Sequence, residues 1–388
     1  MTRALDGNRF ALLTGGTEYF PALEAAFDAA RFEIHVETYI FDADAAGRRI
    51  AQALARAAKR GVATHLLVDG YGSKKLGWRF TARLKKAGVR FLVYRPDIIP
   101  WPFQRQRLRR MHRKLAVIDA SLAFVGGINV IDDMHTPRQT PPRFDYAVRV
   151  EGPLLAEIYP AVKRLWGLVE FMRLGQDWHG QPSLQPQAAP CGRQRGAFVI
   201  RDNLRHRRDI EDAYLEAIGS ARSEILIANA YFLPGLAFRH ALVDAAARGV
   251  RVILLLQARV EYVLMHYASR ALYGTFLDAG IEIHEYHKSF LHAKVAVVDG
   301  HWATVGSSNI DPLSFLLARE ANLVVEDRDF ARELRERLLE AMAAGASRVP
   351  RERWQRPPLA VRTAIWFAYG VARMSTGFFA DARAQEFS

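Results

Sequence analysis

The sequence reads LHAKVAVVDG at residues 291–300 and MHRKLAVIDA at residues 111–120. Both stretches contain His-x-Lys, then four apolar residues, then Asp. In a strand, a His and a Lys two positions apart point to the same face, while the apolar residues after them pack into the core. The chain therefore carries twice the same strand, which begins with His-x-Lys and continues with apolar residues.

The duplication extends well beyond these two stretches, because three further pairs of segments match in the same order. The pairs are AARFEIHVETYIF (29–41) with SARSEILIANAYFLP (220–234), AKRGVATHLLVDG (58–70) with AARGVRVILLLQA (246–258), and AGVRFLVYR (87–95) with AGIEIHEYH (279–287). Within each half, apolar residues at helical spacing alternate with short Val/Ile/Leu-rich runs. This β-α-β-α pattern predicts two tandem, internally duplicated α/β domains, each with a largely parallel, buried sheet.

A segment without periodicity separates the two halves. Residues 176–196 are rich in Gly, Pro and Gln, a composition typical of a linker. We therefore expect a first domain at 1–175 and a second at 197–345. Residues 346–388 remain as a C-terminal tail that we expect to associate with a membrane.

The polar residues that recur indicate chemistry rather than structure alone. His112, Lys114 and Asp119 recur as His292, Lys294 and Asp299, and the Asn-containing turns GGIN (126–129) and GSSN (306–309) follow. Gly-rich turns let backbone N–H groups and an Asn amide approach an anion closely. A lone His or Lys is usually an ordinary polar residue, but recurrence in type and spacing favours a site. Two imidazoles, two ammonium groups and the amides of Asn129 and Asn309 would surround one phosphate.

Composition limits the partners and cofactors. Lys and Arg number 54 against 41 acidic residues, and the net charge of +13 favours an anionic partner, either nucleic acid or an acidic membrane, unless it only reflects a GC-rich genome. The single Cys191 excludes an intrachain disulfide and a cysteine zinc site, and we expect no metal or cofactor. We also expect no signal peptide and no membrane span, which needs about 18 consecutive apolar residues.

The motifs resemble the signature of the phospholipase D superfamily, which is His-x-Lys-x4-Asp followed by Gly-Gly/Ser-x-Asn, present twice in one chain. Longer strings resemble bacterial cardiolipin synthases, most closely the B type, over roughly residues 7–345. These strings are RRMHRKLAVIDASLAFVGGIN, DYAVRVEGP, IANAYFLPG and HWATVGSSNIDPLSFLLAREAN. The resemblance implies two phospholipase D-like α/β domains with the active site at their interface.

The resemblance also implies roles for individual residues. His112 would attack phosphorus to form a phosphohistidine, and His292 would act as general acid and base. Phosphate oxygens would be held by Lys114, Lys294, Asn129, Asn309 and Ser307. Family members place a carboxylate behind each His, and Asp145 and Glu320 lie at similar distances downstream of the two motifs, unless they are surface carboxylates at strand starts. Asp119 and Asp299 belong to the signature, and we expect them in salt-bridged turns.

The expected reaction is transfer of a phosphatidyl group between two phosphatidylglycerol molecules, giving cardiolipin and glycerol. Hydrolysis by a phospholipase D or phosphodiesterase remains open, as do a nuclease and a non-enzymatic basic scaffold. Nucleic acid is the weaker partner because no aromatic platform alternates with basic residues. Segments 97–110 and 359–379 combine aromatic and basic residues, so we expect a peripheral enzyme on the cytoplasmic face of the inner membrane, although both segments could instead pack on the core. The sequence leaves the oligomeric state open.

Overall fold

The computed structural model describes residues 3–96, 109–136, 140–174, 183–202, 205–259, 263–311 and 318–355, together with Thr363 and Gly370. Most of the two predicted membrane segments, 97–108 and almost all of 359–379, therefore lies outside the described residues. No helix that the structure describes combines the length and the apolar character needed to cross a membrane.

The first half alternates strands and helices as the sequence predicts. Its elements are β1 (Leu5–Thr14), α1 (Gly15–Ala29), β2 (Glu33–Thr38), α2 (Ala45–Lys59), β3 (Ala63–Asp69), α3 (Trp78–Lys86), β4 (Arg90–Tyr94), β5 (Arg110–Met111), β6 (Leu115–Ile118), β7 (Leu122–Gly126), β8 (Arg143–Phe144), β9 (Tyr146–Glu151) and α4 (Leu155–Leu174). Helix α2 begins where the Asp44 carboxylate accepts the Gly47 N–H at 2.9 Å, a standard N-cap.

The second half repeats this order. Its elements are β10 (Gln194–Arg201), α5 (Asp209–Ser220), β11 (Glu224–Asn229), α6 (Leu236–Ala247), β12 (Arg251–Gln257), α7 (Val263–Arg270), α8 (Tyr273–Asp278), β13 (Glu282–Tyr286), β14 (Phe290–Leu291), β15 (Lys294–Val298), β16 (Trp302–Gly306), β17 (Ala318–Glu326), α10 (Arg328–Gly345), β18 (Ala346–Arg348) and α11 (Glu352–Gln355).

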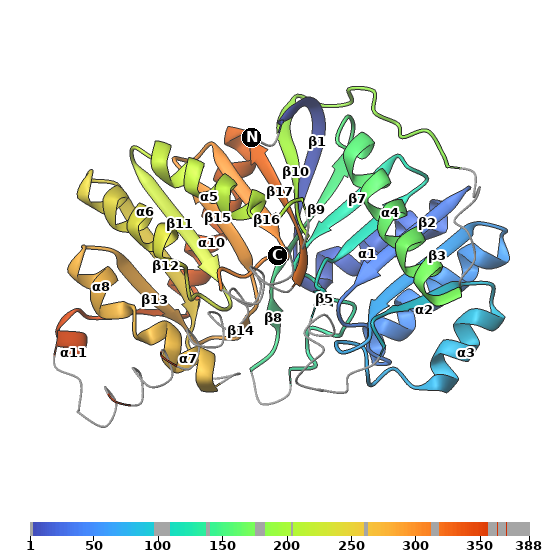
Figure 1. Ribbon diagram of the computed structural model, residues 1–388, viewed down its shortest axis with the longest axis horizontal. Helices are drawn as coiled ribbons and strands as arrows, with labels where there is room; N and C mark the ends of the chain where they lie inside the picture. Colours follow the sequence, from blue (N-terminus) through green and yellow to red (C-terminus); the bar gives the residue numbers. More distant parts are fainter. Residues whose placement is uncertain are drawn as a thin grey trace, which may run out of the picture.

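The strands of both halves join into one long sheet (Figure 1). Its order is β18-β13-β12-β11-β15-β16-β17-β10-β1-β9-β7-β6-β2-β3-β4. Parallel pairing along this path is confined to β2-β3-β4 and β11-β12-β13, so the expectation of a largely parallel sheet is wrong. The short turn at Asp119 connects β6 directly to β7, and a connection this short permits only an antiparallel pair.

Helices cover both faces of the sheet. Alternate residues of β6 separate the layers: Leu115 and Val117 pack into a core with α4 and α10, whereas Ala116 and Ile118 pack against α1 and α2. The second half places α5, α6 and α8 on the face that matches α1 and α2. Because both faces of the sheet are buried, the motif strands are apolar at every position after the His-x-Lys.

The two α/β halves are joined through a shared core. Strands β1 and β10 pair antiparallel at the centre, and the central core combines α4 and β9 of the first half with β17 and α10 of the second. Two strands extend across the predicted boundaries. Strand β10 begins at Gln194, inside the predicted linker, and β18 pairs with β13 beyond the predicted domain end at 345.

Two short strands cross between the halves. Strand β5, just before His112, pairs in parallel with β17, and β14, just before His292, pairs in parallel with β8. Figure 1 shows these strands together at the middle of the molecule. Each motif is thus held by the half to which it does not belong.

Candidate active site

The two signature aspartates hold tight turns. Asp119 and Asp299 have φ of 50° and 49°, in the left-handed region that Asp tolerates better than most residues. The Asp119 carboxylate accepts three backbone N–H groups, from Arg31, Phe32 and Glu33, at 2.8 Å each. Across the described residues neither aspartate forms an ion pair, so the expected salt bridges are replaced by bonds to the chain segment before β2 or β11.

The same arrangement at Asp299 favours its charged form. Burial raises the pKa of this carboxyl, but backbone N–H groups of Glu224, Ser223 and Arg222 outweigh that effect and hold the pKa at about 2. Asp299 is therefore ionised near neutral pH, as suits a carboxylate that accepts hydrogen bonds from the backbone.

We expect Asp119→Ala to lower the free energy of unfolding by about 2–4 kcal/mol, because three backbone donors lose their acceptor. Glu216→Ala, on the exposed surface of α5, is the control and should change stability by less than about 0.5 kcal/mol. Urea unfolding followed by circular dichroism measures both. An unchanged stability combined with lost turnover would instead place Asp119 in the chemistry.

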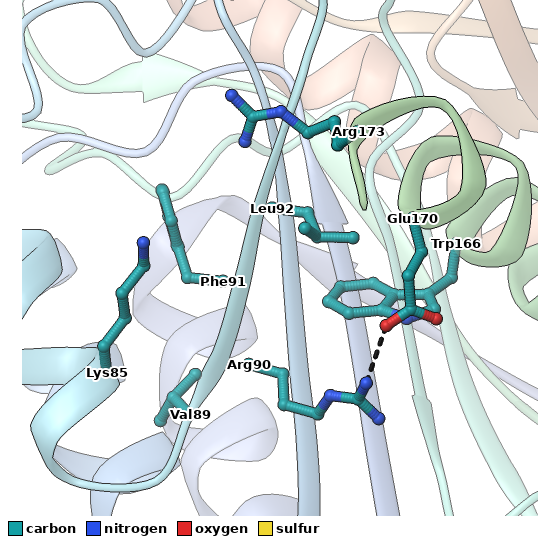
Figure 2. Close-up of a pocket in the computed structure, with 8 residues that line it drawn as sticks. All are labelled: Lys85, Val89, Arg90, Phe91, Leu92, Trp166, Glu170 and Arg173. Carbon is teal, nitrogen blue, oxygen red and sulfur yellow. Dashed lines mark hydrogen bonds and ion pairs between the residues drawn. The ribbon is translucent and has the colours of Figure 1, made fainter. Parts of the chain in front are cut away.

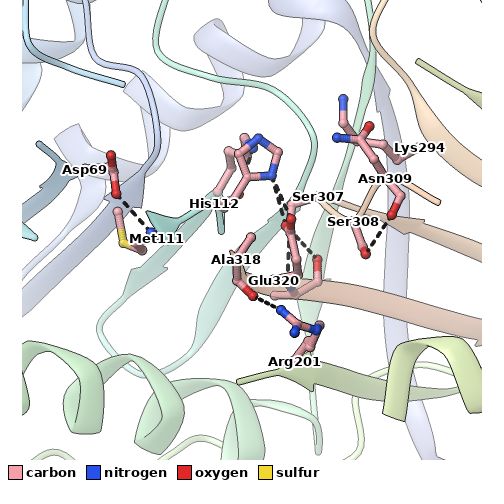
Figure 3. A network of polar contacts seen from close by, with 12 residues as sticks. Asp69, Met111, His112, Arg201, Lys294, Ser307, Ser308, Asn309, Ala318 and Glu320 are labelled. Carbon is pink, nitrogen blue, oxygen red and sulfur yellow. Dashed lines mark hydrogen bonds and ion pairs between the residues drawn. The ribbon is translucent and has the colours of Figure 1, made fainter. Parts of the chain in front are cut away.

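Each histidine is held by a carboxylate from the other half of the chain. His112 Nδ1 lies 2.9 and 3.0 Å from the two oxygens of Glu320, and His292 Nδ1 lies 2.6 Å from Asp145 Oδ2 (Figure 3 shows the first pair). Both carboxylates are buried. Chain spacing alone would have matched each carboxylate with the histidine of its own half.

The backbone explains the crossed pairing. The His112 N–H donates to Arg319 O at 2.9 Å, and the His292 N–H donates to Phe144 O at 2.8 Å. Each histidine is thus fastened to the residue just before its carboxylate, as an extension of the crossing strands. With Nδ1 bonded to a carboxylate, Nε2 of each ring is left for chemistry.

Ser307 does not have the phosphate-binding position that the sequence suggested. It is fully buried, its hydroxyl donates to Glu320 Oε2 at 2.6 Å, and the Ala321 N–H donates to it at 3.0 Å. The first-half counterpart is Gly127, where a Cβ atom would lie 2.3 Å from Asp145 Oδ1. In the second half the Ser307 hydroxyl orients Glu320, whereas in the first half Gly127 leaves room for Asp145.

The two lysines lie beside the histidines. Lys114 Nζ donates to His112 O at 2.7 Å, and Lys294 Nζ donates to His292 O and lies 3.7 Å from Asp145 Oδ2. Lys294 Nζ also lies 2.9 Å from His292 Nδ1. The contact between His292 Nδ1 and Asp145 Oδ2 is shorter, so Nδ1 carries a proton and donates a hydrogen bond to the carboxylate. Lys294 is among the charges that lower the pKa of Lys114, so the two buried lysines lie close to each other. Two buried cations close together create a site for an anion.

The signature asparagines complete the site from the turns after β7 and β16. Asn129 accepts the Ile40 N–H through its Oδ1 at 3.0 Å and so fixes the chain that follows β2. Asn309 is buried, and its Oδ1 has no hydrogen-bond partner among the described residues. An unpaired amide oxygen can accept a hydrogen bond from a hydroxyl of a ligand, whereas the amide nitrogens of the two asparagines can donate to phosphate oxygens.

Burial and mutual charge set the protonation of this cluster. Burial lowers the pKa of His112 against the opposing charge of Glu320, and burial together with nearby cations, chiefly Lys294, lowers the pKa of His292 further. Burial also lowers the pKa of Lys114 to about 7. Both imidazoles are therefore neutral near neutral pH in the free protein, and a neutral imidazole is the nucleophilic form.

Two residues next to the first motif, Tyr39 and Asp69, lie outside the repeated pattern. The ring of Tyr39 meets the His112 ring edge-on with centroids 4.8 Å apart, and the Asp69 carboxylate accepts the Met111 N–H at 2.9 Å. Tyr39 corresponds to Ala230 in the repeat, so the walls beside the two histidines differ. A comparison of the halves for polar or aromatic residues that fail to recur would have singled out Tyr39.

The comparisons with known proteins agree with this geometry. The family described as "Cardiolipin synthase, PLD-like domain" matches residues 23–157 and 214–342. Cardiolipin synthase B of Escherichia coli (strain K12) is 40% identical over 356 residues, which are 90% of this chain and 85% of that protein. Cardiolipin synthase B of Salmonella typhi is 42% identical over 334 residues, or 86% and 80%.

Solved structures show the same fold at low sequence identity. The phosphatidylserine synthase of Haemophilus influenzae Rd KW20 has a TM-score of 0.68 at 14% identity, covering 94% of this chain and 93% of that one. The polyphosphate kinase of Porphyromonas gingivalis has a TM-score of 0.59 at 14% identity, covering 96% and 53%. With the family match over both halves, these findings show that the chain belongs to the cardiolipin synthases with phospholipase D-like domains.

Proposed function

We propose that the protein transfers a phosphatidyl group from one phosphatidylglycerol to a hydroxyl of a second, forming cardiolipin and releasing glycerol. The observation that carries the proposal is the crossed pair of histidines, each with Nδ1 bonded to a buried carboxylate and each beside a buried lysine. Two such imidazoles are what a double displacement at phosphorus needs, one to attack and one to move protons. The cardiolipin synthase relatives supply the lipid class.

In the first step Nε2 of His112 attacks phosphorus, and the bond from phosphorus to the oxygen of the headgroup glycerol breaks. His292 gives that oxygen a proton, so glycerol leaves and a phosphatidyl-histidine remains. In the second step His292 takes the proton from the acceptor hydroxyl, whose oxygen attacks phosphorus while the P–N bond breaks. Lys114, Lys294 and the two asparagines stabilise charge on the nonbridging oxygens.

His292 must be protonated in the first step although its pKa is low in the free protein. Burial and neighbouring cations cause that low pKa, and a bound phosphodiester anion offsets the cations. Substrate binding therefore raises the pKa of His292 and prepares it to act as the acid.

Hydrolysis by the same cycle would need only water in place of the acceptor alcohol. The relatives that match most of this chain are cardiolipin synthases, so transfer is favoured over a phospholipase D or a nuclease. We place the enzyme peripherally at the cytoplasmic face of the inner membrane, where its phospholipid substrate lies.

The test is incubation with labelled phosphatidylglycerol vesicles, followed by separation of the lipids. Cardiolipin with release of glycerol supports the proposal, whereas phosphatidic acid as the only product would mean hydrolysis. Turnover should persist in excess EDTA, because lysines rather than a metal ion neutralise the phosphate. Loss of turnover on chelation with recovery on adding one particular metal would contradict this mechanism.

The lowered pKa of Lys114 predicts how turnover depends on pH. Since its pKa in the free protein is about 7, the ammonium form is lost as pH rises through 7, and kcat/KM should fall above that pH. A bound phosphate favours the charged amine, so the fall in kcat should begin at higher pH. Lys114→Arg stays charged and should remove the alkaline fall at a lower maximal rate. If kcat/KM of Lys114→Arg still fell above pH 7, a group other than Lys114 would cause the fall.

A further inference from the structure

One end of the first half is strongly basic. Residues 70–96 contain no Asp or Glu and eight basic residues, which are Lys74, Lys75, Arg79, Arg83, Lys85, Lys86, Arg90 and Arg95. All except Arg95 are exposed, and they cover α3, the loop before it and the edge strand β4. Figure 1 shows α3 at the end of the molecule opposite α11. We call this surface the basic end.

Most cations of the basic end have no acidic partner among the residues that the structure describes. Within the described residues, Arg90 pairs with Glu170 at 2.6 Å, and the six exposed cations before it in sequence have no ion pair. Helix α2 shows the usual alternative, since Arg49 and Arg56 pair with Glu24 of α1. Grouped cations without counter-charges create a positive field that attracts anionic surfaces.

The repeat shows that the shared fold does not require this charge. Helix α8 takes the place of α3 before the strand that corresponds to β4, and it carries no Lys or Arg. Its Asp278 pairs with Arg351 at 2.9 Å, and the nearby Arg270 pairs with Glu285 at 2.7 Å. The basic end is therefore a feature of one half only, as expected for an added function.

Aromatic side chains accompany the cations. Trp78, the first residue of α3, is 74% exposed, and the Arg79 guanidinium lies 5.5 Å from its ring centroid. Tyr71 is also exposed, with Lys74 Nζ 4.8 Å from its ring centroid. Exposed Trp and Tyr beside Lys and Arg are typical of surfaces that enter the headgroup region of a bilayer.

A recess continues the basic end around the sheet edge (Figure 2). Its volume is about 470 Å³, and it is lined by Lys85 and Arg173 together with the Arg90–Glu170 ion pair. Apolar side chains, including those of Phe91, Leu92 and Trp166, line the rest. Cations beside an apolar wall suit the junction between the headgroup and the acyl chains of an anionic lipid.

The basic end also touches the strand that delivers the candidate nucleophile. The Arg110 guanidinium lies 5.4 Å from the Tyr71 ring centroid, and Asp69, at the end of β3, accepts the Met111 N–H at 2.9 Å. The loop that carries the cations before α3 is therefore next to the residues that precede His112.

From these observations we infer that the basic end is the surface by which the protein docks on an anionic phospholipid membrane. The inference rests on the proposed function, because a site that takes membrane lipids must meet the bilayer. A second copy of the chain is a poor occupant, since two surfaces of like charge repel each other.

The experiment compares two charge-matched variants of the full chain. The first removes four cations of the basic end (Lys75→Gln, Arg79→Gln, Arg83→Gln, Lys86→Gln), and the control removes four exposed arginines elsewhere (Arg31→Gln, Arg222→Gln, Arg328→Gln, Arg332→Gln). Sedimentation with vesicles of phosphatidylglycerol in phosphatidylcholine should show about a 100-fold weaker affinity for the first variant, and at most a few-fold change for the control. Trp78→Ala should weaken binding about 10-fold and reduce the part that resists high salt.

A water-soluble, short-chain phosphatidylglycerol separates docking from catalysis. Its turnover needs no membrane, so all three variants should process it at the wild-type rate. Failure of the wild type on this substrate would count against the proposed function and leave the vesicle result standing. Equal losses of vesicle affinity in the two four-residue variants would overturn the inference, as would unchanged affinity in the first. Loss of single-stranded DNA binding alone would assign the basic end to nucleic acid.

Discussion

His112→Ala should form no phosphatidyl-enzyme and lose about 10⁶-fold in turnover, the size of effect seen when a covalent nucleophile is removed. Among the described residues of this site, His112 and His292 are the two histidines whose rings are held by a buried carboxylate. His292→Ala should slow both half-reactions by about 10²–10⁴-fold, since it removes only proton transfer.

A substrate with a good leaving group distinguishes the two histidines. A p-nitrophenyl phosphodiester needs little protonation, so His292→Ala should still form the phosphohistidine and accumulate it. Mass spectrometry of a digest kept at neutral to basic pH should find the adduct on the peptide MHRKLAVID (111–119). An adduct on residues 290–299 of His112→Ala, with none in His292→Ala, would reverse the two roles. No adduct in either variant would remove the covalent mechanism.

Glu320→Gln should behave like a defect of His112, although Glu320 belongs to the other half of the chain. The amide cannot stabilise the charge that grows on the attacking imidazole, and it can hold the wrong tautomer, so we expect about a 10²–10⁴-fold loss in kcat with little change in KM. Formation of the p-nitrophenyl-derived adduct should slow by the same factor. Glu326→Gln, exposed in the same strand, is the control and should be active.

Asp145→Asn should give the opposite pattern, because Asp145 holds His292. Turnover of phosphatidylglycerol should fall by a similar factor, while the p-nitrophenyl substrate should still label His112 rapidly. Thermal unfolding by circular dichroism checks that both variants fold. If Glu320→Gln labelled rapidly and Asp145→Asn did not, the crossed pairing would not be the one that acts in catalysis.

Several features could be predicted from sequence because they depend on short-range patterns. The His-x-Lys-x4-Asp strands, the Asn turns and the β-α-β-α order recur at fixed local spacing, and each reports which residues share one face or one turn. The duplication thus predicted His112, Lys114, His292 and Lys294 as members of one site. The family match over both halves is consistent with this assignment.

The sequence determined by itself the duplicated α/β fold, the set of polar residues and the family. Tertiary structure alone decided which carboxylate serves which histidine, that Ser307 supports Glu320, and that both halves form one sheet. The pairings β5-β17 and β8-β14 join segments far apart in the chain, and no local spacing encodes them. In a duplicated chain each strand has two equivalent partners, and only packing around the shared core selects between them.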